Sequence, residues 1–148
     1  MTETEHNMAI SDSRRLNMVL PYLYPNLINQ GNTEGDYHLQ NDMDGRGIQL
    51  HWHNVEITEP TTQQLADAKE AAVDAYWWKL LRGARDRLLE TSDWSQGADV
   101  PSDLKASYAT YRTDLRDLPT TVTKPDFATL NGQETSEWNI DALMPSKP

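Results

Sequence analysis

The sequence of 148 residues contains no cysteine, which excludes disulfide bonds, thiolate catalysis and cysteine-based zinc sites. It contains a single phenylalanine, and only 37% of its residues are hydrophobic, with a mean hydropathy of −0.75. We therefore expect a small core, in which five tryptophans and six tyrosines supply much of the apolar surface. The length suits one ordinary domain with additional tails.

Long apolar runs and positive charge are also scarce. No apolar stretch is long enough to span a bilayer, and the polar, acidic start from Met1 to Asn7 does not resemble a signal peptide. The 23 Asp and Glu outnumber the 13 Lys and Arg, which gives a net charge of −10. Binding to nucleic-acid phosphates or anionic membranes needs basic side chains. We therefore expect a soluble cytoplasmic protein that binds neither nucleic acid nor membrane.

Motifs that carry catalysis are absent from the sequence as well. It contains no G-x-S-x-G nucleophile turn, no phosphate-binding loop and no H-E-x-x-H metal motif. The segment Gly45-Arg46-Gly47 is too short for a dinucleotide site, and no carboxylate pair lies in an apolar setting suited to acid catalysis. We expect no enzymatic activity and no cofactor.

The N-terminal region combines a polar start with an apolar segment. Residues 1–12 show no pattern and are predicted to form a tail, followed by a short helix over Ser13–Leu20 that Pro21 ends. The apolar stretch Leu20–Ile28 contains two prolines, so we predict an extended arm there. The Gly- and Asn-rich residues 29–35 are predicted to form a loop.

Alternation of apolar and polar residues predicts a β-hairpin within residues 36–55. Asp44-Gly45 is typical of a tight two-residue turn, in which both residues have positive φ. Two strands alone are marginally stable in water, so we expect another element or a partner chain to cover one face. The alternating apolar residues are Tyr37, Leu39, Ile48, Leu50 and Trp52.

The same hairpin contains two patterns that could suggest a metal. The run from Gln40 to Gly45 resembles a calcium loop, but Gln40 and His51 stand where an EF-hand needs Asp and Glu, which favours a simple turn. His51 and His53 share one strand face, and a two-residue turn would place His38 opposite His51. A shared three-histidine site is geometrically open, but solvent-facing histidines are the commoner case, and we assign no metal site.

After Pro60 the pattern changes to that of helices. Thr61 and Gln64 form a capping box before an apolar stripe, and Pro101-Ser102 marks a second helix start. We predict an antiparallel pair of helices over about 61–90 and 102–117, with Trp94 buried against their ends and Ser92 or Asp93 bonded to backbone amides. The stripe residues are Leu65, Ala72, Tyr76, Leu80, Ala84 and Leu88 in the first helix and Leu104, Tyr108, Tyr111, Leu115 and Leu118 in the second.

Two local features of the first helix bear on partners. Its basic residues predict a solvated face with the ion pairs Arg82–Asp86 and Arg87–Glu90, and docking on an acidic partner is the alternative. The neighbouring Trp77 and Trp78 point about 100° apart, so one helix cannot cover both. One of the two needs another part of the chain or another protein. The basic residues are Lys79, Arg82, Arg85 and Arg87.

The stretch from Arg82 to Pro119 carries a distinctive combination of motifs. An Arg-rich helix leads into Leu88-Leu89, a Ser-Asp-Trp turn follows at residues 92–94, and residues 111–119 read Tyr-Arg-Thr-Asp-Leu-Arg-Asp-Leu-Pro. This combination resembles the phage tail assembly chaperone family. The ending Met144–Pro148 is similar to the Trp-Pro-x-Lys-Pro tail of that family, with Met in place of Trp. The segment Thr120–Asn139 and the N-terminal arm depart from the family pattern.

The resemblance implies a non-enzymatic protein that binds phage tail or tail-fibre proteins during assembly in the host cytoplasm. Two roles stay open, namely a chaperone that leaves and a structural subunit that is retained in the virion tail, in its baseplate, adaptor or fibre. A homo-oligomer also stays open. The family has no catalytic residues to carry over.

The patterns together predict the α+β class, with a β-hairpin followed by a helical hairpin and with extended arms at both ends. We predict an N-terminal arm over residues 1–35, a central domain over residues 36–119 and an irregular C-terminal arm over residues 120–148. Apolar side chains without helical or strand periodicity are expected to bind partners. The predicted partner-binding residues are Tyr22, Leu23, Tyr24, Leu27, Trp78, Trp138, Ile140 and Leu143.

Overall fold

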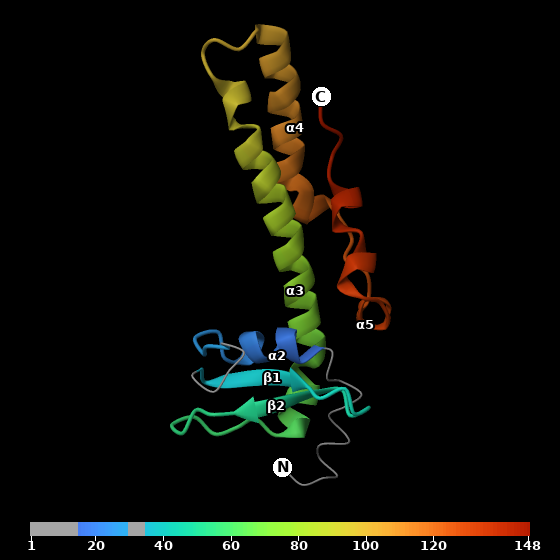
Figure 1. Ribbon diagram of the computed structural model, residues 1–148. Helices are drawn as coiled ribbons and strands as arrows, with labels where there is room; N and C mark the ends of the chain where they lie inside the picture. The colour runs from blue at the N-terminus through green and yellow to red at the C-terminus, as the bar shows by residue number, and fades with distance from the viewer. Residues whose placement is uncertain (1–14, 30–34) are drawn as a thin grey trace. The chain divides into compact units, whose positions relative to one another are not determined.

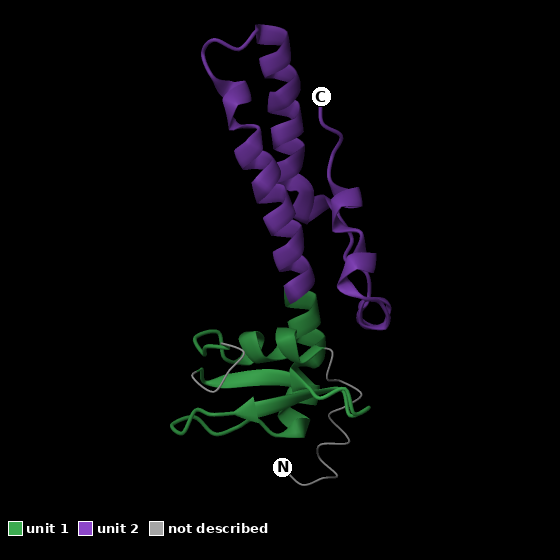
Figure 2. Ribbon diagram, in the orientation of Figure 1, with its two compact units in different colours: residues 1–75 green, residues 76–148 purple. Residues whose placement is uncertain are grey.

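The computed structural model describes residues 15–29 and 35–148, in which a two-stranded sheet and several helices agree with the α+β class (Figure 1). The chain divides into two compact units, residues 1–75 and residues 76–148 (Figure 2). Helix α3 (Thr62–Thr91) contributes residues to both. The predicted tail over residues 1–12, the predicted helix start at Ser13 and most of the predicted loop over residues 29–35 lie outside the described residues.

The sheet of the first unit confirms the period-two pattern. Strands β1 (Tyr37–Asn41) and β2 (Ile48–Trp52) pair antiparallel, with Tyr37 opposite Trp52 and Leu39 opposite Leu50. The apolar residues of both strands share one face and join the core of this unit. His38 lies opposite His51, which is the register expected from the sequence.

The connection between the strands differs from the predicted tight turn. Pairing ends at Asn41 and Ile48, so residues 42–47 form a longer loop. Positive φ occurs at Met43, Gly45 and Gly47, and the expectation of a positive φ at Asp44 is wrong. The Asp44 carboxylate instead accepts hydrogen bonds from the backbone N and the Nε of Arg46, at 3.0 and 2.6 Å. These side-chain bonds take the place of the backbone bonds that close a two-residue turn.

The predicted extended arm is wrong at its start, because helix α2 (Leu16–Leu23) continues through Pro21. Leu16 and Val19 are buried and Leu20 is fully buried, and the last turn is held by a 2.8 Å bond from Tyr24 N to Leu20 O. Burial of three apolar side chains outweighs the tendency of a residue before proline to leave the helical region.

The chain after α2 runs beside β1 and adds to the core of the first unit. Ile28 O accepts a bond from Asp36 N at 2.9 Å, and Asn29 forms a parallel bridge with Tyr37. Tyr24 packs edge-on against Trp52, with ring centroids 5.4 Å apart. Leu23, Tyr24 and Leu27 therefore contact the core.

Helices α2 and α3 supply the cover that the two strands need. Leu65 and Ala72 of α3 lie in the same apolar cluster as the α2 side chains and the inner face of the sheet. The predicted capping box is confirmed, since Thr61 N donates to Gln64 Oε1 at 2.8 Å and Gln64 N donates to Thr61 Oγ1 at 3.1 Å. The inner face of the sheet is thus covered by other parts of the same chain.

The second unit contains the end of α3 and a series of helical elements. One of them, α4 (Ser102–Thr121), is longer than the sequence predicted, because it passes Pro119. Short helices also occur within the segment that was expected to be irregular. Asp126 caps one of these, α5 (Phe127–Gly132), by accepting a bond from Thr129 N at 2.8 Å. The elements are η2 (Asp93–Gln96), α4 (Ser102–Thr121), α5 (Phe127–Gly132), η3 (Thr135–Trp138) and η4 (Ile140–Leu143).

Asp36 joins three segments of the first unit. Its carboxylate accepts bonds from Ile28 N at 2.7 Å and from Asn54 Nδ2 at 2.9 Å, and its carbonyl accepts from His53 N at 2.8 Å. The bond from the Ile28 amide, followed by that from Asn54, lowers the pKa of Asp36 below its ordinary value.

We therefore expect the first unit to lose stability as the pH falls below the ordinary range of an aspartate carboxyl and through the lowered folded-state pKa of Asp36. The lowered pKa means that the stabilisation is complete above the unfolded-state pKa. Urea titrations at several pH values should show this acid loss, and Asp36→Asn should be less stable at neutral pH with a flatter acid branch. Asp42→Asn is the matched control. An unchanged acid branch in Asp36→Asn would contradict the assignment.

Candidate partner-binding surface

A buried arginine stabilises the turn between the end of α3 and the start of α4. Arg112 of α4 is 8% exposed, and its Nη1 donates to Leu89 O at 2.6 Å and to Ser92 Oγ at 2.8 Å. Its Nη2 donates to Asp93 Oδ1 at 2.7 Å, where the two groups form an ion pair. A cation at a helix C-terminus is stabilised by the exposed carbonyls and the helix dipole. Arg112 thus caps α3 and fixes the turn.

The turn itself is held by a chain of short hydrogen bonds. Ser92 Oγ donates to Leu88 O at 2.7 Å, Ser95 Oγ donates to Ser92 O at 2.5 Å, and Gly97 N donates to Trp94 O at 3.1 Å. A Cβ at Gly97 would lie 3.3 Å from that same Trp94 oxygen, so the close approach favours glycine. The prediction that Ser92 or Asp93 bonds backbone amides is wrong, because both side chains are bonded to Arg112 instead.

The prediction that Trp94 is buried is also wrong. Its side chain is 53% exposed and packs edge-on against Tyr108, with ring centroids 5.1 Å apart. The space against the helix ends is filled by buried side chains of α4, which pack against Leu88 and Leu89. Trp94 is therefore left on the surface of the turn. The buried side chains of α4 are Tyr108, Tyr111 and Leu115.

The predicted partner-binding residues of the first unit differ in exposure. Tyr22 is 47% exposed at the end of α2. Leu23, Tyr24 and Leu27 are half-buried, because each contacts the core of this unit. Of these four side chains, Tyr22 offers a partner the largest exposed fraction.

The two neighbouring tryptophans of α3 differ in burial, as expected for adjacent residues of a helix. Trp77 is fully buried and Trp78 is half-buried, with their rings 87° apart. The Arg82 guanidinium lies 5.6 Å from the centre of the Trp78 ring, in a cation–π contact. Asp86 pairs with Arg85 at 2.9 Å, whereas the sequence had suggested Arg82. Trp78 and Arg82 thus form one half-open surface.

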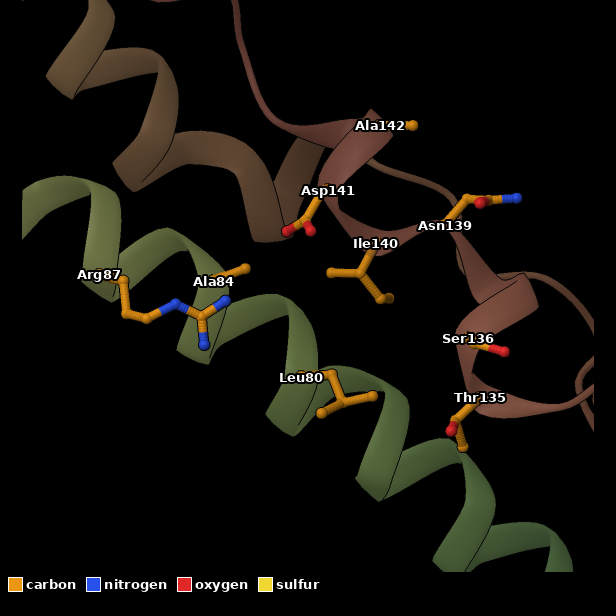
Figure 3. A pocket seen from close by; sticks show the side chains of 9 residues that line it. All are labelled: Leu80, Ala84, Arg87, Thr135, Ser136, Asn139, Ile140, Asp141 and Ala142. Atoms are coloured by element: carbon orange, nitrogen blue, oxygen red, sulfur yellow. The ribbon is translucent and has the colours of Figure 1, made fainter.

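Two of the three predicted residues near the C-terminus line shallow hollows of the second unit. Trp138 is buried, and its Nε1 donates to Leu130 O at 3.1 Å. Ile140 lines a hollow of about 330 Å³, into which Leu80 of α3 also points (Figure 3). Leu143 lines a second hollow of about 280 Å³ and is 37% exposed. Ile140 is therefore half-buried and Leu143 is exposed, whereas Trp138 belongs to the buried part of the second unit.

The three histidines of the hairpin lie together on the face of the sheet that is opposite the core. The His38 ring stacks on His51 and His53, with centroids 4.6 and 4.8 Å apart, and His38 Nδ1 lies 2.6 Å from His53 Nε2. Within residues 15–29 and 35–148, no group of three His, Asp or Glu side chains has a geometry that could hold a metal ion. The cluster is therefore described as a stacked set of imidazoles.

Comparison with known protein families finds a match to part of the second unit. Residues 78–138 match the family model described as phage tail assembly chaperone protein. The resemblance that the Arg82–Pro119 motifs indicated is thereby confirmed. No curated protein and no solved structure matches the chain. In the part of the chain that the structure describes, no helix is long and apolar enough to cross a membrane.

We expect Arg112→Ala to reduce the free energy of unfolding of the second unit by about 2 kcal/mol, because it removes the bonds to Leu89 O, Ser92 Oγ and Asp93 Oδ1. Arg112→Lys should recover only part of the loss, since an ammonium cannot reach three acceptors as a guanidinium fork does. Urea titration of the full chain measures both. Arg116→Ala is the matched control, because Arg116 is exposed on the same helix. Equal losses in the Arg112 and Arg116 variants would contradict the capping role.

The two tryptophans of the second unit should respond differently to truncation. Trp138→Ala should cost roughly 3 kcal/mol or more, because it empties a buried site and removes the bond to Leu130 O. Trp94→Ala should cost about 1 kcal/mol, the value of an exposed aromatic pair. Denaturant unfolding followed by circular dichroism compares the two. A larger loss for Trp94→Ala would mean that this side chain belongs to the core.

Proposed function

Because residues 78–138 match the phage tail assembly chaperone family, we propose that this chain is a non-enzymatic protein that binds other tail proteins while the phage tail is assembled. The single observation that carries the proposal is this family match, which includes the Arg112 cap and the Trp94 turn. The acidic composition and the lack of a catalytic motif agree with it. We place its action in the host cytoplasm, where tails are built.

The partner-binding residues are proposed from the exposed apolar side chains of the two terminal regions. Tyr22 in the first unit and Leu143 in the second are each more than one-third exposed, and Ile140 opens into a hollow. Large apolar or aromatic side chains of this kind are enriched among the residues that dominate protein interfaces. Leu23, Tyr24, Leu27 and Trp138 contribute mainly by holding these surfaces in place.

Helices α3 and α4 are proposed to act as one rigid antiparallel pair in this function. The buried residues of α4 pack against Leu88 and Leu89, and Arg112 bonds to the last turn of α3. The half-open surface of Trp78 and Arg82 then lies on a fixed helix rather than on a mobile segment. A rigid surface loses less conformational entropy on binding.

Co-expression of the tagged chain with the tail proteins of the same phage tests the proposal. We expect a tail protein to co-purify with the full chain, and Tyr22→Ser with Leu143→Ser to weaken its capture. Val55→Ser is the matched control, since Val55 is 97% exposed in a loop to which we assign no binding role. Equal capture by both variants would contradict the residues, and capture of no tail protein would contradict the function.

Mass spectrometry of purified virions distinguishes the two tail roles. A chaperone that leaves should be absent from the particle while still binding a tail protein in the co-expression experiment. The alternative, a structural subunit, should be present in a fixed ratio to known tail proteins. Absence from the virion together with no captured tail protein would exclude both roles.

A further inference from the structure

We infer that the exposed turn around Trp94 docks a basic segment of a partner protein. We call this surface the Trp94 face and define it as Trp94, Leu104, Asp99 and Asp103. The inference rests on the proposed binding of tail proteins and adds the chemistry of the segment that is bound. It concerns a part of the second unit that the predicted partner-binding residues do not include.

The first argument is the rigidity of an exposed tryptophan. Trp94 is 53% exposed, yet its backbone lies in η2 and its carbonyl accepts the bond from Gly97 N. Ser95 beside it is fully buried, and Asp93 before it is paired with Arg112. A large side chain held in place binds with little loss of conformational entropy, and tryptophan is among the residue types that contribute most at interfaces.

The second argument is the apolar area next to Trp94. Leu104 is 39% exposed and stands one helical turn before Tyr108, so the two side chains lie on the same side of α4. Tyr108 in turn contacts Trp94, with ring centroids 5.1 Å apart. Trp94 and Leu104 are thus both neighbours of the buried Tyr108, and both are open to solvent.

The third argument is charge. The segment from Glu90 to Lys105 contains four carboxylates and one ammonium. Asp93 is paired with Arg112, but Glu90, Asp99 and Asp103 are exposed, and none of the three has an ion-pair partner among residues 15–29 and 35–148. Carboxylates beside exposed apolar side chains favour a partner that presents Lys or Arg around an apolar side chain.

The overall charge also disfavours a second copy of this chain as the occupant. The net charge of −10 means that the acidic Trp94 face would meet another acidic molecule. Like charges across an interface disfavour association. A basic segment can pair with the carboxylates of the Trp94 face, and an Arg guanidinium can also stack on the exposed indole of Trp94.

Two synthetic amphipathic peptides test the chemistry of the surface in the full chain. One consists of Leu, Ala and Lys, and the other has Glu in place of every Lys. By calorimetry we expect the Lys peptide to bind and the Glu peptide not to bind. Trp94→Ala should weaken binding of the Lys peptide at least tenfold, whereas Trp94→Phe should weaken it less. Circular dichroism confirms that each variant is folded.

Two double variants that remove the same charge test whether binding depends on the Trp94 face or only on the overall negative charge of the chain. Asp99→Asn with Asp103→Asn should weaken binding of the Lys peptide and flatten its dependence on salt. Glu56→Gln with Glu70→Gln removes the same charge from exposed positions of the first unit and should leave binding unchanged. Equal weakening by both pairs, or equal binding by the wild type and Trp94→Ala, would overturn the inference.

Separately purified tail proteins of the same phage then distinguish this inference from the proposed function. A tail protein that binds the wild type at least tenfold more tightly than Trp94→Ala supports both. One that binds the two chains equally leaves the function intact and overturns the inference. If no tail protein binds while the Lys peptide still depends on Trp94, the proposed tail role fails and the chemistry of the surface stands.

Discussion

The structure of the second unit depends on one buried guanidinium. Arg112 donates to the Leu89 carbonyl at the end of α3, and it forms an ion pair with Asp93 at the start of the turn. Removing a cation from water is costly, and the cost is offset only where several acceptors surround it. Here a carbonyl, a hydroxyl and a carboxylate all lie within 2.8 Å of its nitrogens. The turn can therefore be short, rigid and open to solvent at once.

The first unit meets a different constraint, because two strands cannot form a stable sheet alone. Helix α2 and the first turns of α3 cover one face of the sheet. The apolar side chains of α2, of the sheet and of α3 therefore form one core. The Tyr37 and Trp52 rings stack with centroids 5.9 Å apart, and Tyr24 closes against the same indole. Asp36 then ties the segment after α2 and the segment after β2 to the sheet.

Periodicity in the sequence predicted the elements that depend on local chemistry. Spacing along the chain predicted three features that the structure contains. They are the strand register, the Thr61–Gln64 capping box and the different directions of the Trp77 and Trp78 side chains. Spacing along the chain did not predict features that depend on a side chain far away in the sequence. Arg112 lies about twenty residues from Ser92 and Asp93, so nothing local shows that it binds both or that it leaves Trp94 outside. Helix α2 likewise continues through Pro21 because its apolar side chains are buried by other elements.

Among the described residues, both units carry exposed large apolar side chains. Tyr22 and Ile28 lie on the first unit, and Trp94, Leu104 and Leu143 lie on the second. A small group with an acidic border contributes a weak, salt-sensitive contact, whereas several groups that engage one partner together gain from their high effective concentration. Binding of this kind is strong while all contacts hold and is lost quickly once some are displaced. That combination suits the proposed role, in which the chain binds a tail protein while the phage tail is assembled.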